Sequence, residues 1–134
     1  HRTSSNRNGM EICLETADRD FEGICFLNLV DFDAKYGHRN DVDGYAAALS
    51  DFDSFLPGLL GKMREEDLLI ITADHGCDPG TPSTDHSREY VPVLMYGKGF
   101  AGKELGISES FAAVAQTVSD YLGLEEKFAC ESFL

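Results

Sequence analysis

Three of the four histidines in this 134-residue sequence stand close to an aspartate in the chain. The pairs are Asp33 with His38, Asp74 with His75, and Asp85 with His86. A carboxylate and an imidazole that fold toward one point can bind a divalent cation, because each offers a lone pair. Oxygen and nitrogen ligands without thiolate suit Mn²⁺, Mg²⁺ or Zn²⁺. The spacing therefore indicates metal chemistry.

Each pair also has a plainer interpretation. Asp33 and His38 would fit an Asx-type turn with a surface histidine, and His86 would fit an ordinary exposed loop. Asp74 and His75 are harder to explain in this way. They end a very apolar segment, where burying two polar groups requires compensation. A bound metal would supply that compensation.

The motifs DFDAKYGHR, TADHGCDP and TDHSREYVPVL resemble, in this order and spacing, the carboxy-terminal motifs of phosphopentomutases, a family of the alkaline phosphatase superfamily. The resemblance runs from about Asn8 to the end of the chain. It implies a site for two Mn²⁺ ions, with Asp33, His38 and His86 on one ion and Asp74 and His75 on the other. It also implies an isomerase of nucleoside metabolism that interconverts ribose or deoxyribose 1-phosphate with the corresponding 5-phosphate.

Phosphopentomutases also carry an early aspartate ligand, a threonine that accepts the phosphoryl group, and an inserted cap domain. No stretch of this sequence matches those parts. We therefore expect the chain to contribute metal ligands but no catalytic nucleophile, and to be inactive alone. The alternatives are another phosphatase or a phosphoglycerate mutase of the same superfamily, or a non-catalytic metal-binding domain.

Four further residues of these motifs are candidates for supporting roles. Asp31 is predicted to orient a metal ligand by a hydrogen bond, without binding the metal itself. Arg39 and Arg88 would be able to neutralise a phosphate, although exposed arginines more often form surface ion pairs. Cys77 follows the ADHG motif, and we favour packing as a small apolar side chain over metal binding, since the acids and histidines already supply ligands.

The apolar patterns predict the elements that must position these side chains. Continuous apolar runs predict strands over residues 23–30, 68–72 and 91–96, each covered on both faces. Helical spacing predicts helices over residues 9–17, 44–63 and 111–122, the second bent near Pro57 and the third capped by Ser110 and ended by Gly123. Together they predict an α/β fold, a single domain over residues 1–134. It would be a partial alkaline-phosphatase-like core with a mainly parallel sheet flanked by helices and one exposed edge.

Composition limits the partners. Eleven Lys and Arg against twenty-four Asp and Glu give a net charge of −13, which disfavours nucleic acid and anionic membrane surfaces. A phosphorylated pentose remains compatible, because cations would lie between it and the carboxylates. The four cysteines form no C-x-x-C pair, and no apolar run approaches a membrane span, so we expect reduced thiols and a cytoplasmic protein. The expected protein partners are the remaining part of a longer chain, or a second copy at the exposed edge.

Overall fold

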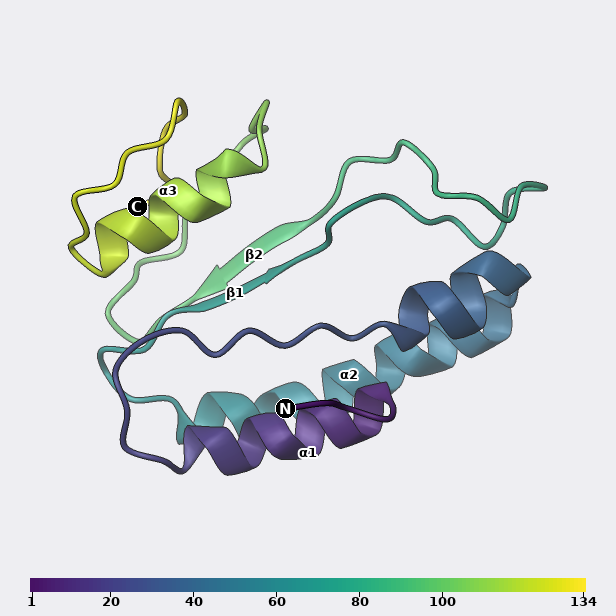
Figure 1. The fold of residues 1–134 in the computed structure, drawn as a ribbon, viewed down its shortest axis with the longest axis horizontal. Helices are drawn as coiled ribbons and strands as arrows, with labels where there is room; N and C mark the ends of the chain where they lie inside the picture. The colour runs from purple at the N-terminus through teal and green to yellow at the C-terminus, as the bar shows by residue number, and fades with distance from the viewer. The chain divides into compact units, whose positions relative to one another are not determined.

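A computed structural model describes all residues from His1 to Leu134, and they divide into two compact units, His1–Gly99 and Phe100–Leu134. The expectation that residues 1–134 form one domain stays a prediction. The first unit contains, in chain order, α1 (Asn6–Ala17), the π-helical turn η1 (Phe32–Tyr36), the 3₁₀ turn η2 (Gly37–Arg39), α2 (Val42–Lys62), β1 (Leu69–Thr72) and β2 (Val93–Tyr96) (Figure 1). The second unit contains α3 (Ala112–Tyr121).

Side-chain caps fix where the first two α-helices begin. The Ser5 hydroxyl accepts a hydrogen bond from the Asn8 amide at 3.2 Å, so α1 starts three residues earlier than the predicted residue 9. The Asp41 carboxylate accepts one from the Gly44 amide at 2.9 Å, and α2 accordingly includes Val42. Pro57 lies inside α2 without ending it.

The predicted parallel sheet is wrong. The structure has one sheet of two antiparallel strands, in which Leu69 of β1 lies opposite Tyr96 of β2 and Thr72 opposite Val93. Both strands fall within the predicted runs. Residues 23–30, predicted as a third strand, form no strand, because they pair with neither β1 nor β2.

The second unit is built around α3. Thr117 is fully buried; its hydroxyl donates to the Ala113 carbonyl at 2.7 Å and accepts from the Phe133 amide at 2.9 Å. The chain after the helix therefore packs back along it. Gly123 has a φ of 67°, which supports its predicted role as the helix end. The N-cap position is Phe111, one residue after the predicted Ser110, whose hydroxyl accepts a hydrogen bond from the Ala112 amide at 3.1 Å.

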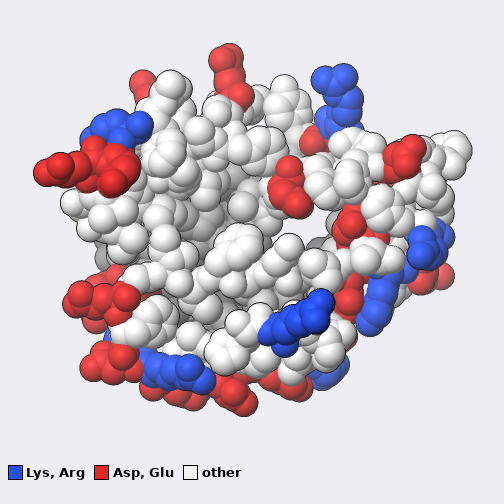
Figure 2. Space-filling model, viewed as in Figure 1, with Lys and Arg blue, Asp and Glu red and all other residues white.

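Acidic and basic side chains are interspersed on the surface. On the face shown in Figure 2, lysines and arginines lie next to carboxylates and make no continuous basic surface. None of the helices is both long enough and apolar enough to cross a membrane.

Candidate metal centre

Asp33 and His38 are presented by two consecutive tight turns. Asp33 lies in η1, and its carbonyl accepts the Gly37 amide that begins η2, the turn carrying His38. Asn40 then takes a left-handed conformation with a φ of 52°, which ends η2 before α2 begins. The two turns thus place the side chains of Asp33 and His38 on one short, tightly coiled segment.

Asn40 also ties the second motif loop to these turns. Its side-chain amide donates to three backbone carbonyls of that loop, at 3.3 Å to Pro79, 2.5 Å to Thr81 and 3.0 Å to Ser83. The loop that carries His86 is therefore attached to the turn that carries His38. Sequence reasoning missed Asn40; the preference of asparagine for left-handed turns is the signal that would have identified it.

A short antiparallel bridge closes the base of that loop. The Ser87 amide donates to the Gly76 carbonyl at 2.9 Å, and the Asp78 amide donates to the Ser87 hydroxyl at 3.0 Å. The bridge brings together the histidines that precede each partner. The rings of His75 and His86 stack with centroids 3.7 Å apart.

Gly37 and Cys77 form a further contact between the two motif segments. A Cβ added at Gly37 would lie 2.2 Å from Cys77 Sγ, so only glycine allows this approach. Burial raises the pKa of the Cys77 thiol, and the adjacent Asp33 carboxylate raises it further. Cys77 therefore stays a protonated thiol at neutral pH, consistent with its predicted packing role.

Three imidazoles gather around one carboxylate. Asp33 Oδ1 lies 3.3 Å from His38 Nε2 and 3.4 Å from His86 Nε2. Asp33, His75 and His86 also each offer a ligand atom within 4.8 Å of the others. Two atoms bound tetrahedrally to one ion at about 2.1 Å would be separated by about 3.4 Å. The observed spacing therefore suits a shared cation.

The hydrogen bonds of the cluster fit a cation as well. His38 Nδ1 contacts the Thr84 carbonyl, and His75 Nδ1 lies 3.2 Å from the Gly76 carbonyl. A carbonyl only accepts, so each of these Nδ1 atoms carries a proton, which leaves Nε2 as the ring atom that can bind a metal. Asp33 Oδ1 is buried and makes no hydrogen bond. Lone pairs thus converge where a positive ion would compensate them.

Asp74 lies at the margin of this cluster. Its side chain is 84% exposed, and its Oδ1 atom is 3.6 Å from His75 Nε2. His75 therefore contacts Asp74 and also belongs to the group around Asp33, whereas the family resemblance implies that His75 and Asp33 serve different ions. The structure brings His38, His75 and His86 to Asp33 and leaves Asp74 in solvent.

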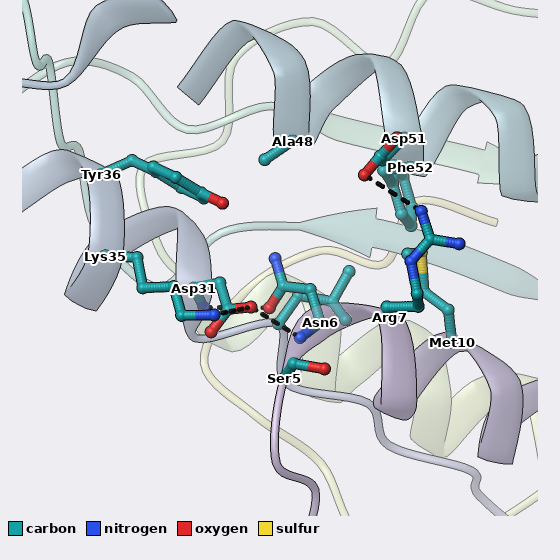
Figure 3. A pocket seen from close by; sticks show the side chains of 11 residues that line it. Ser5, Asn6, Arg7, Met10, Asp31, Lys35, Tyr36, Ala48, Asp51 and Phe52 are labelled. Atoms are coloured by element: carbon teal, nitrogen blue, oxygen red, sulfur yellow. Dashed lines mark hydrogen bonds and ion pairs between the residues drawn. The ribbon is translucent and has the colours of Figure 1, made fainter. Parts of the chain in front are cut away.

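Asp31 lies outside the cluster. One carboxylate oxygen accepts from the Asn6 amide at 2.9 Å and from Lys35 Nζ at 3.2 Å, so Asp31 joins η1 to the start of α1. It lines a cavity of about 190 Å³ between α1, η1 and α2, where Arg7 of α1 pairs with Asp51 of α2 (Figure 3). No contact links Asp31 to the histidines.

Neither candidate phosphate-binding arginine forms an ion pair with the carboxylates of the cluster, Asp33 and Asp74. Arg39 donates to the carbonyl of its neighbour His38 at 3.1 Å, and Arg88 is exposed. Their role in binding phosphate therefore stays a prediction.

Fold and site define a protein whose Asp and His side chains are arranged to hold a metal ion. The chain belongs to the metalloenzyme superfamily, whose family model matches residues 1–126, and membership of this superfamily implies a metal. The sequence is 58% identical to the phosphopentomutase of Acetivibrio thermocellus over 130 residues, which is 96% of this chain and 34% of that protein.

Two further relatives carry the same name. The phosphopentomutase of Lachnoclostridium phytofermentans is 54% identical, with 98% of this chain and 34% of the relative covered. That of Carboxydothermus hydrogenoformans is 56% identical, with 92% of this chain and 32% of the relative covered. The predicted resemblance to phosphopentomutases is confirmed. The chain spans about a third of the length of these curated relatives.

Proposed function

We propose that this chain is the metal-binding part of a phosphopentomutase, which interconverts (deoxy)ribose 1-phosphate and (deoxy)ribose 5-phosphate. The observation that carries the proposal is the buried Asp33 Oδ1, which has no hydrogen bond and faces two histidine nitrogens. The similarity to phosphopentomutases adds the substrate class. A phosphorylated pentose would approach this acidic chain through the bound cation.

The residues that would hold metal are Asp33, His38, Asp74, His75 and His86. Within this set Asp33 and Asp74 supply the negative charge, and the hydrogen bonds from Nδ1 of His38 and His75 orient their rings. Mn²⁺ is the proposed ion because the resemblance to phosphopentomutases implies it, and imidazole and carboxylate ligands without thiolate are compatible with it. When bound, it would supply charge stabilisation to a phosphoryl group in transfer.

The test is a chimaera of the Acetivibrio thermocellus phosphopentomutase in which the matched 130-residue stretch is replaced by this chain. With Mn²⁺ the chimaera should convert ribose 1-phosphate to ribose 5-phosphate, and Asp33→Asn should lower kcat at least about 100-fold, as loss of a charged ligand to a catalytic ion would. The exposed Asp85→Asn is the matched control. A chimaera whose turnover is unaffected by Asp33→Asn contradicts the assignment. The 134-residue chain alone should show no turnover.

A further inference from the structure

Two cysteines lie side by side between α1 and the extended chain that follows it. Residues 24–29 run back along α1 toward its start (Figure 1). A Cβ added at Gly9 would lie 2.9 Å from Leu27 Cδ1, so helix and extended chain meet there. Cys13 stands one helical turn further along α1, and Cys25 stands two residues earlier in the extended chain. Four helical residues rise about 6 Å and two extended residues span about 7 Å, so the two cysteines are level with each other.

Both cysteines line one groove of about 380 Å³. The α1 residues of this groove are Gly9, Ile12, Cys13 and Thr16, whose spacing places them on one face of the helix. The Cys13 thiol lies within hydrogen-bonding reach of the Cys25 sulfur. Cys13 is half-buried, Cys25 is exposed, and both are free thiols. The groove therefore holds two neighbouring thiols, one of which is open to solvent.

We propose that Cys13 and Cys25 are a redox-active pair that a hydroperoxide converts to an intrachain disulfide. The exposed Cys25 reacts first. Its thiolate sulfur attacks one oxygen of the peroxide and the O–O bond breaks, which leaves Cys25 as a sulfenic acid. The hydroxide or alkoxide that leaves takes up a proton to form water or an alcohol.

Cys13 completes the reaction as the resolving thiol. Its sulfur attacks the sulfenic sulfur of Cys25, the S–O bond breaks, and the hydroxyl group leaves with the Cys13 proton as water. Together the two thiols lose two electrons, which the peroxide gains. Burial raises the pKa of Cys13 to about 11, so this thiol is a poor first nucleophile. The order of attack therefore follows from the difference in exposure.

Peptide mapping of the 134-residue chain tests the bond directly. The reduced chain is treated with hydrogen peroxide in the presence of a chelator, its remaining thiols are blocked, and it is digested with trypsin without reduction. The tryptic peptides 8–19 and 20–35 carry Cys13 and Cys25, and the other two cysteines lie on separate peptides. We expect these two peptides to be joined, at a rate that does not depend on chain concentration. Disulfides between chains, or a Cys25 sulfinic acid without a disulfide, overturn the proposal.

Serine substitutions separate the two roles. In Cys13→Ser, Cys25 should stop at the sulfenic acid, which dimedone traps. In Cys25→Ser, Cys13 should keep its thiol under the same treatment. Cys130→Ser, in the second unit, is the matched control and should form the disulfide as the wild type does. Oxidation of Cys13 at the wild-type rate in Cys25→Ser contradicts the proposal.

The melting temperature provides an independent measurement. The bond closes a loop of 13 residues, from Cys13 to Cys25, and so restricts the unfolded chain. The oxidised chain should melt about 5–10 °C higher than the reduced chain, and dithiothreitol should abolish the difference. An equal or lower melting temperature shows that the thiols meet only when the groove opens, which overturns the pairing. Neither metal nor substrate takes part, so the result is independent of the proposed function.

Discussion

His86 Nε2 lies 3.4 Å from Asp33 Oδ1, and that carboxylate oxygen makes no hydrogen bond. Without a cation, the arrangement leaves this buried negative oxygen without a hydrogen bond and 3.3 Å from His38 Nε2, whose lone pair faces it, which is unfavourable. With a cation the same groups become ligands. Asp33 is therefore expected to destabilise the folded chain without a metal ion and to stabilise it when one is bound.

We expect Asp33→Asn to have opposite effects in the two states. In chelator the variant should melt about 3 °C higher, because a poorly compensated charge costs roughly 1 kcal/mol. With Mn²⁺ the wild-type chain should gain stability and the variant should gain less, with an affinity for Mn²⁺ at least about tenfold weaker. Calorimetric titration and melting curves measure both. Asp85→Asn should behave as wild type, and an unaltered affinity in Asp33→Asn would remove Asp33 from the site.

The three hydrogen bonds of Asn40 predict that it stabilises the site from outside it. Asn40→Ala should lower the free energy of unfolding by about 2 kcal/mol, through lost hydrogen bonds and a left-handed φ that alanine tolerates poorly. Asn40→Gly relieves the backbone strain and should recover part of that loss. Both should weaken Mn²⁺ binding, because His86 is no longer held beside His38. Urea unfolding measures the effect on stability, and metal titration measures the effect on Mn²⁺ binding. Undiminished Mn²⁺ affinity in both variants would show that Asn40 does not position His86 for metal binding.

The contact between Gly37 and Cys77 predicts a compensating pair of substitutions. Gly37→Ala places a Cβ 2.2 Å from Cys77 Sγ and should destabilise the chain by about 2 kcal/mol. Cys77→Ala removes that sulfur, and its remaining Cβ lies at an acceptable 3.6 Å. The double variant should therefore be more stable than Gly37→Ala alone in a denaturant melt. If the stability losses of the two single variants simply add in the double variant, the clash with Cys77 Sγ is not what destabilises Gly37→Ala.

Cys13 predicts a loss of stability at high pH. Burial, and to a lesser degree the neighbouring Cys25 thiol, raises the pKa of Cys13 from 9.0 to about 11. The folded chain thus holds this proton more tightly than the unfolded chain, so the contribution is complete below pH 9 and is lost as the pH rises through 11. The difference in unfolding free energy between wild type and Cys13→Ala should be constant to pH 8.5 and shrink above pH 9. Parallel pH profiles would contradict this.

Much of the local structure followed from apolar spacing. The runs that predicted β1 and β2 contain the observed strands, and the predicted helices lie within a few residues of α1, α2 and α3. The parallel sheet failed because pairing is not local. Leu27 and Leu29 do alternate with exposed neighbours as in a strand, but a strand also needs a neighbour, which no local pattern can reveal.

The assignment of the candidate ligands to two ions stays a prediction. The motifs identified the aspartates and histidines, and the family resemblance divided them between two ions. The structure places His75 against His86, since the Gly76–Ser87 bridge aligns the two arms of the loop. That alignment depends on hairpin register and on Asn40, neither of which is visible in the spacing of ligands.

The loop between β1 and β2 is fastened at both its base and its tip. The bridge at Gly76 and Ser87 fixes the base, and Asn40 binds the carbonyls of Pro79, Thr81 and Ser83 near the tip. Adding or deleting one residue between β1 and Gly76, or between Ser87 and β2, would shift the register of the hairpin and move an imidazole to its opposite side. A length change nearer the tip would break the bonds to Asn40. Unlike most surface loops, this one should tolerate neither insertions nor deletions.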